Sequence, residues 1–345
     1  MFTNLTIITL GPSEAVLDYK KKEPSVECIR PLKASKDWKG DITFSSKKAD
    51  PSIEGFEFPC RKCIACRLNT AREKAIRSFH EAQMHDNSIF LTMTYDEDNL
   101  KSDRLDYSDF QKFMKKLRKH NTLGLNNEEK KAKHISYMVT GEYGERTKRP
   151  HWHVCLFNYW PKDADIIRTT HNGHLVYRSP TIEKIWNKGM TEFGELTLDS
   201  AGYVARYAAK KLVHGKDEEH DYQPIHNTST KYGLGKKWIE KYWKQTFDLG
   251  YVRLPNGEKA KIPRFYTDWL KEKRPEEFKK YEETVRVEIA NKVKEKRKKE
   301  EMDFLSHIFS RRQKGGNNPW PQKRIEVKQR ILESKFKRLQ ENLKL

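Results

Sequence analysis

Two histidines separated by one hydrophobic residue, His151 and His153, follow a carboxylate at Glu142 in this 345-residue chain. Further along, Tyr203 and Tyr207 stand four residues apart. In a strand, residues two apart point to the same side, so both imidazoles can reach one metal ion. On a helix, residues four apart are neighbours, so the two phenols lie side by side. The order predicts a divalent-metal site followed by two nucleophiles able to attack a phosphodiester.

The context of these residues adds more than their spacing, because a chain with 12 His and 15 Tyr often contains one such pair by chance. Arg206 and Lys210 each follow a tyrosine by three residues, near enough to steady a phosphate or a phenolate. We therefore count both residues among the catalytic candidates, and the bland alternative for the tyrosines is a half-buried amphipathic pair.

The cysteines form a second cluster that is typical of metal binding. Cys60, Cys63 and Cys66 are spaced C-x2-C-x2-C, Cys28 lies upstream, and Cys155 falls in the histidine-rich strand. Three thiols so close together cannot all pair with one another, which disfavours a disulfide framework. The spacing suits structural zinc or an iron–sulfur cluster, with Cys28 or a histidine as the fourth ligand. Three reduced thiols near a helix start are the alternative.

Charge and composition indicate a nucleic-acid partner. Lys and Arg (69) exceed Asp and Glu (49) by 20, and aromatic residues make up 11% of the chain, enough to stack on unpaired bases. No apolar run approaches the roughly 20 residues of a membrane span. The N-terminus has no signal-peptide pattern, so we expect neither secretion nor a membrane but a reducing cytoplasm. Residues 271–345 hold 23 basic and 13 acidic residues, a net charge of +10, and predict a basic helical or mobile extension.

The hydrophobic patterns predict an α+β fold. Expected strands cover 89–95, 134–140, 151–157 and 190–198, and expected helices cover 70–85, from 108 onward, 181–186 and 200–214. Thr70-x-x-Glu73 is interpreted as a capping box and Ser108 as an N-cap. From Ile89 the order is β-α-β-β-α-β plus a terminal helix, which favours a ferredoxin-like antiparallel sheet with helices on one face. We divide the chain into a mixed segment (1–58), a domain that begins with the cysteine cluster (59–215), a connecting region (216–270) and the basic tail (271–345).

Four stretches together resemble the HUH endonucleases, in which U is a hydrophobic residue. The resemblance is closest to the rolling-circle replication initiators (replication-associated proteins) of small single-stranded DNA phages, the gokushovirus branch of the microviruses. It covers about residues 28 to 215 and is thin beyond Gly215. The matching stretches are Pro59–Leu68 (PCRKCIACRL), Phe90–Tyr95 (FLTMTY), Gly141–Gly144 with Arg149–His153 (GEYG and RPHWH), and Tyr203–Tyr207 (YVARY).

The resemblance implies that 59–215 is an HUH endonuclease domain in which His151 and His153 hold one magnesium or manganese ion. Glu142 is implied as the third ligand, with Glu145 as its rival. Tyr203 or Tyr207 would attack the origin strand, leaving a 5′-phosphotyrosine and a 3′-OH, so the expected activity is that of a metal-dependent nickase and strand transferase.

The same resemblance implies the partners. These are single-stranded and replicative-form viral DNA at the origin and host helicase and polymerase, in the cytoplasm of a bacterial host. A monomer would suffice for a two-tyrosine cycle that closes a single-stranded circle. Two other hypotheses stay open: a basic protein that packages nucleic acid without catalysis, and a structural zinc protein. Neither would use the ordered histidines and paired tyrosines.

Overall fold

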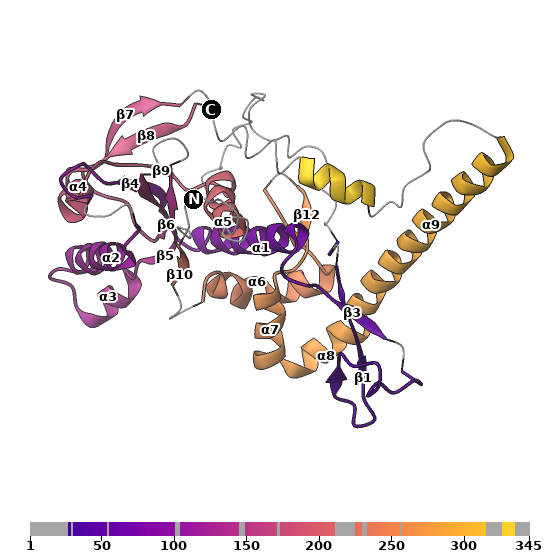
Figure 1. Ribbon diagram of the computed structural model, residues 1–345. Coiled ribbons are helices and arrows are strands. Elements are labelled where there is room, and N and C mark those ends of the chain that lie inside the picture. The colour runs from indigo at the N-terminus through magenta and orange to yellow at the C-terminus, as the bar shows by residue number, and fades with distance from the viewer. Residues whose placement is uncertain are drawn as a thin grey trace.

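The computed structural model describes residues 27–28, 30–53, 55–100, 104–144, 149–170, 173–210, 225–229, 233–255, 257–314 and 326–334, without the side chains of 203, 206–210 and 311–314. Its centre is a seven-stranded antiparallel sheet with the order β10-β5-β6-β4-β9-β8-β7 (Figure 1). The strands are β4 (Ser88–Thr94), β5 (Ser136–Tyr143), β6 (Pro150–Phe157), β7 (Asp165–Thr169), β8 (Leu175–Arg178), β9 (Thr191–Glu195) and β10 (Ile225–Thr228).

One face of this sheet carries the main hydrophobic core. Helices α2 (Tyr107–Asn121) and α4 (Pro180–Trp186) pack there, and the short α3 (Asn127–Ala132) follows α2. The fully or nearly buried side chains come from alternate strand positions and from one stripe of each helix: Ile89, Leu91, Met93, Val139, Trp152, Val154, Leu156, Phe110, Phe113, Met114, Leu117, Ile182 and Trp186. The predicted β-α-β-β-α-β unit is confirmed, with β4 between β6 and β9.

The other face of the sheet is covered as well, so the expectation of helices on one face is wrong for the sheet as a whole. Helices α1 (Ile64–Ala82) and α5 (Leu198–Lys210) pack against each other and on this face (Figure 1). Small side chains at the contact allow a close approach. The buried residues here are Ala71, Ala75, Val204 and Ala205 from the helices and Met138, Cys155 and Phe157 from the strands. Hydrophobic periodicity gives the buried stripe of a helix but not the sheet face that receives it.

Three boundaries differ from the sequence expectation. Helix α1 begins at Ile64, and Thr70 lies inside it with its hydroxyl donating to the Cys66 carbonyl at 3.0 Å, so the capping box is wrong. The N-cap of α2 is Asp106 rather than Ser108. Strand β5 continues past residue 140 to Tyr143, which brings Gly141 into the strand. A Cβ on Gly141 would lie 2.6 Å from the Trp152 ring, so only glycine fits there.

The remaining elements lie outside the large sheet. A separate three-stranded sheet, β2-β1-β3, is formed by β1 (Leu32–Lys36), β2 (Ile42–Thr43) and β3 (Phe56–Phe58). Helices α6 (Lys236–Leu249) and α7 (Arg264–Lys273) share a core with α8 (Pro275–Glu283), and the ribbon β11 (Val252–Arg253)–β12 (Lys259–Ala260) packs beside α1. Helix α9 (Val285–Lys314) extends away from the rest as a long rod (Figure 1). Among the described helices, none combines the length and apolar character of a membrane span.

Candidate functional site

The β5–β6 hairpin brings Glu142 beside both histidines. Cross-strand register pairs Glu142 with His151 and Thr140 with His153. The Oε1 atom of Glu142 lies 2.8 Å from Nε2 of His151 and 3.0 Å from Nε2 of His153. The hairpin closes where the Gly144 N–H donates to the Arg149 carbonyl at 2.9 Å. These three side chains therefore form a group that can hold a metal ion.

The residue between the histidines fixes their direction. Trp152 is fully buried on the opposite face of the sheet, and its indole N–H donates to the Tyr95 hydroxyl at 2.9 Å. Arg149 donates to the Tyr95 carbonyl at 2.8 Å and forms an ion pair with Glu97. Because side chains alternate along a strand, anchoring Trp152 in the main core points both histidines toward α1 and α5.

Each imidazole has a second partner that orients its ring. Nδ1 of His151 lies 3.2 Å from the Arg149 carbonyl, which can only accept, so Nδ1 carries the proton and Nε2 offers its lone pair to a cation. Nδ1 of His153 lies 3.1 Å from the Thr92 hydroxyl, and the Phe90 ring stacks on the imidazole with centroids 5.6 Å apart. The neighbouring strand β4 thus positions His153 from one side while Glu142 holds it from the other.

Burial makes the group electrostatically demanding. Burial alone would raise the pKa of Glu142, but hydrogen bonds to His151 and His153 and their positive charge outweigh it, and the net pKa is lowered. Burial lowers the pKa of His153, against the pull of Glu142. The Glu142 Oε2 atom is buried without a hydrogen-bond partner among the residues the structure describes. An anionic oxygen left in this way, beside two imidazole nitrogens, fits a bound divalent cation.

The two tyrosines lie on α5, and their side chains are outside the described part of the structure, as are those of Arg206 and Lys210. The backbone of α5 is held to the sheet one residue after Tyr203, where the Thr140 hydroxyl donates to the Val204 carbonyl at 3.2 Å. Thr140 is the cross-strand partner of His153. The helix that carries both tyrosines therefore covers the sheet face on which the histidines lie. Glu145, the rival ligand, falls outside the described residues.

One residue of this region had no signal in the sequence. His226, on β10, has its Nδ1 atom 2.8 Å from the Thr140 hydroxyl. Because that hydroxyl donates to Val204, Nδ1 of His226 must be the donor in this contact. Strand β10 pairs with β5 across more than eighty residues of chain, and local patterns do not predict pairing between segments so far apart.

The cysteines form the second group that can hold a metal ion. The sulfur atoms of Cys28, Cys60, Cys63 and Cys66 all lie within 4.8 Å of one another. Cys155 is not part of this cluster and packs in the core between β5, β6 and the α1–α5 pair. All five are free thiols in the described chain.

Comparison with known proteins gives the class to which this fold and site belong. A family described as replication-associated protein ORF2 matches residues 88–212, the stretch from β4 through α5. The chain is 53% identical to "Replication-associated protein VP4" of Bdellovibrio phage phiMH2K, over 93% of this chain and 100% of that protein. It is therefore a member of the replication-associated proteins of phages, and the expected kinship with microvirus initiators is confirmed.

Two more distant relatives carry the same description. "Replication-associated protein ORF4" of Chlamydia phage 1 is 30% identical over 63% of this chain and 54% of that protein. "Replication-associated protein ORF2" of Spiroplasma virus 4 is 29% identical over 72% of this chain and 85% of that protein. No solved structure matches the chain.

Proposed function

We propose that this protein is the HUH-type nickase and strand transferase that initiates rolling-circle replication of a phage genome. The observation that carries the proposal is the contact of Glu142 Oε1 with Nε2 of His151 at 2.8 Å and of His153 at 3.0 Å, on the sheet face covered by the helix that bears Tyr203 and Tyr207. Membership of the phage replication-associated proteins supports it.

His151, His153 and Glu142 would hold one magnesium or manganese ion. Mixed imidazole and carboxylate donors suit manganese at least as well as magnesium. The bound ion supplies electron withdrawal from phosphorus and orientation of the scissile phosphate. The hydrogen bonds of Thr92 and the Arg149 carbonyl keep both Nε2 atoms directed to one point, so the three donors need little rearrangement to accept a cation.

The covalent step belongs to the tyrosines. The phenolic oxygen of Tyr203 or Tyr207 forms a bond to phosphorus, and the bond from phosphorus to the 3′ oxygen breaks. The phenol proton is lost and the 3′ oxygen gains one, which leaves a 5′-phosphotyrosine and a free 3′-OH. Arg206 and Lys210 steady the phosphate and the departing charge. The phosphodiester energy is retained, so rejoining needs no ATP.

Two tyrosines on one helix allow a complete cycle by one chain. Host polymerase and helicase extend the 3′-OH and displace the strand, and the second tyrosine then cuts the regenerated origin. The released 3′-OH attacks the first phosphotyrosine, which closes a single-stranded circle. In this proposal residues 59–215 are the catalytic unit within the bacterial cytoplasm, after the segment 1–58 and before the connecting region 216–270. The tail 271–345, with the exposed basic run Lys292–Lys299 on α9, adds salt-sensitive affinity for the DNA backbone.

A denaturing gel of the protein with a labelled single-stranded origin oligonucleotide and manganese tests this proposal. We expect a heat-stable adduct with the natural chain and with either single Tyr→Phe variant. The double variant Tyr203→Phe/Tyr207→Phe should form none, while the control Tyr251→Phe should behave as the natural chain. DNA mapped by mass spectrometry to another residue, or binding without any adduct, would favour a packaging protein instead.

A further inference from the structure

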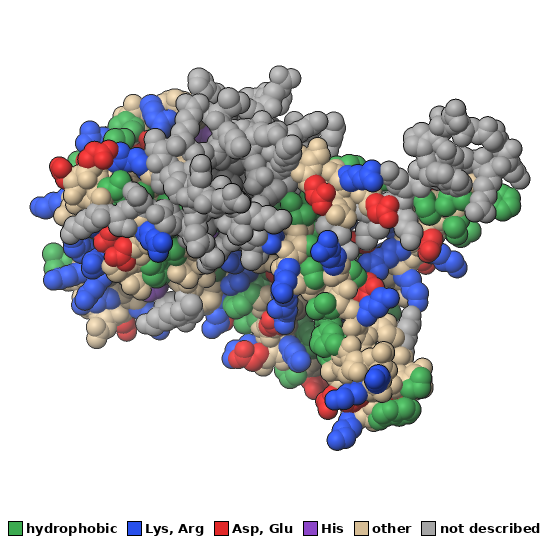
Figure 2. Space-filling view, in the orientation of Figure 1, with side chains coloured by type: hydrophobic (Ala, Val, Ile, Leu, Met, Phe, Trp, Pro, Cys, Tyr) green, Lys and Arg blue, Asp and Glu red, His purple; other side chains and the backbone are tan. Residues whose placement is uncertain are grey.

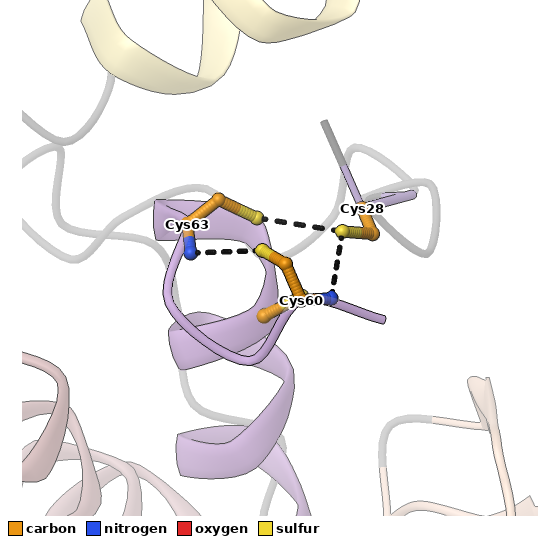
Figure 3. A group of neighbouring side chains, drawn as sticks. Cys28, Cys60 and Cys63 are labelled. Atoms are coloured by element: carbon orange, nitrogen blue, oxygen red, sulfur yellow. Dashed lines mark hydrogen bonds between the residues drawn. The ribbon is translucent and has the colours of Figure 1, made fainter. Parts of the chain in front are cut away.

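The cysteine cluster lies where the small N-terminal sheet meets helix α1 (Figure 3). Strands β1 and β3 are antiparallel with Leu32 opposite Phe58, so Cys28, just before β1, and Cys60, just after β3, come to the same end of the ladder. Cys63 is the N-cap of α1 and Cys66 lies in its first turn. Four thiols from three chain segments therefore converge on one point.

The spacing of the sulfur atoms fits a single tetrahedral ion. The Sγ atoms of Cys63 and Cys28 are 3.9 Å apart, and no pair in the cluster exceeds 4.8 Å. Thiolates bound to one zinc at about 2.3 Å lie about 3.8 Å from one another in a tetrahedron. A disulfide would need about 2.05 Å. An iron–sulfur cluster would hold its thiolates farther apart, because they bind different iron atoms.

The backbone is arranged to support thiolates. The Cys63 N–H points at the sulfur of Cys60 at 3.3 Å, and the Cys60 N–H points at the sulfur of Cys28 at 3.2 Å (Figure 3). Burial would raise the pKa of Cys60, but the backbone N–H groups of Cys63 and Lys62 outweigh it and lower that pKa to about 6. Between the two ligands Arg61 has a φ of 59°, a left-handed conformation that side chains disfavour and that surrounding constraints must maintain.

The N-terminal sheet has almost no hydrophobic core of its own. Among the described residues of 30–58, Ala34 is the one buried side chain. Hydrophobic side chains lie instead on the surface of this lobe, at the lower right of Figure 2: Leu32, Trp38, Ile42, Phe44 and Ile53. A lobe this small cannot be held together by apolar burial alone and needs a covalent or metal link.

We propose that Cys28, Cys60, Cys63 and Cys66 together bind one structural zinc ion that fastens the β1–β3 lobe to helix α1. On binding, the thiols release their protons to solvent and no electron is transferred. Because α1 packs along α5, the ion also fixes one end of the helix pair that covers the histidine face. The inference does not depend on the proposed nicking activity.

Metal content of the full-length chain tests the assignment. The protein is dialysed against a weak chelator that empties carboxylate–imidazole sites, and its zinc is then measured by mass spectrometry. We expect about one zinc per chain in the natural protein and in the variants Cys155→Ala and His153→Ala. The double variant Cys60→Ser/Cys63→Ser should retain none. Zinc kept by the double serine variant, or lost from His153→Ala, would overturn the assignment.

A measurement on the natural chain guards against a variant that does not fold. Replacement of zinc by cobalt should produce the intense near-ultraviolet absorption of cobalt bound to four thiolates. Stripping the metal with a mercurial should open new protease sites within residues 28–63 while the large sheet resists. Iron with sulfide, a disulfide in the intact mass, no thiolate absorption, or an unchanged cleavage pattern would each refute the proposal.

Discussion

Glu142, His151 and His153 lie in a sheet whose two faces are both covered by helices, whereas the four clustered cysteines border a three-stranded sheet in which Ala34 alone is buried among its described residues. In the first region, anchored neighbours such as Trp152 orient the ligands, and the fold does not need the ion. In the second, few contacts would remain without the ion. Two clusters with similar numbers of donors therefore have opposite dependencies: one adds chemistry to a finished fold, and the other completes the fold.

The largest expected effect is on nicking at the sheet site. His151→Ala or His153→Ala should lower adduct formation by more than about 100-fold, because a ligand of the proposed ion is lost. DNA binding should change little. The buried Glu142 loses one hydrogen-bond donor in either variant, so the free energy of unfolding should fall by only about 1–3 kcal/mol. Circular dichroism and thermal unfolding check the fold; global unfolding of either variant would break the comparison.

Thr92→Val should have the next largest effect. Its hydroxyl lies 3.1 Å from Nδ1 of His153 and orients that ring. Loss of such an orienting contact weakens metal affinity by about 10–100-fold. We expect the manganese concentration for half-maximal nicking to rise by that factor, while the rate at saturating manganese is largely kept. Thr94→Val is the matched control, because its hydroxyl donates to the Met190 carbonyl outside the site. Equal shifts in both variants would contradict this role.

A smaller effect on nicking is expected from the cysteine cluster. Cys60→Ser/Cys63→Ser should lower cleavage of a short oligonucleotide by less than about 10-fold, because local opening of the N-terminal lobe leaves the large sheet folded. The same preparation should lose protease resistance within residues 28–63. Loss of nicking as complete as in His153→Ala would mean that the cluster supports the reaction centre directly, and the contrast between the regions would fail.

The smallest effect concerns acid stability, through the helix that both regions share. His80 on α1 stacks on Trp238 with ring centroids 3.6 Å apart, and burial lowers its pKa to about 3. A lowered folded pKa means that the unfolded chain binds a proton that the folded chain excludes. Stability from this group is therefore complete above pH 6.5 and falls by at most about 1.4 kcal/mol per pH unit toward pH 3.

The variant His80→Asn should flatten that decline in chemical unfolding curves recorded between pH 7 and pH 4. Exposed His120, changed to Asn, is the control and should keep the natural slope. An unaltered slope in His80→Asn would show that other groups govern acid unfolding of the α1 region.

Strong periodicity predicts the central unit well. Ile89, Leu91 and Met93 alternate into the core, and Phe110, Phe113 and Leu117 form one helical stripe, as expected. The failures occur where a local pattern meets distant structure. Thr70 and Glu73 match a capping box, yet the preceding residues are already helical. The pattern places Gly141 in a loop, but the ring of Trp152 on the facing strand requires glycine there.

The candidate site is predictable in its residue types but not in its geometry. The order of Glu142, His151 and His153 indicates a metal group, because two residues of a strand spaced by one share a face. That Glu142 stands directly opposite His151 depends on the extension of β5 through Gly141, which the sequence pattern does not indicate. His226 and the pairing of β10 depend on contacts between distant segments, which a single sequence does not reveal.

The closed end of the β5–β6 hairpin separates the length of its connection from the reaction centre. Since the ladder is already complete between Gly144 and Arg149, residues added between these two leave the pairing of Glu142 with His151 unchanged. One residue inserted before Gly144 would instead turn alternate side chains to the opposite face. The tip of this hairpin is thus a place where loops of different length can be grafted, so a reporter peptide or a new DNA-reading segment could be installed there without redesigning the catalytic sheet.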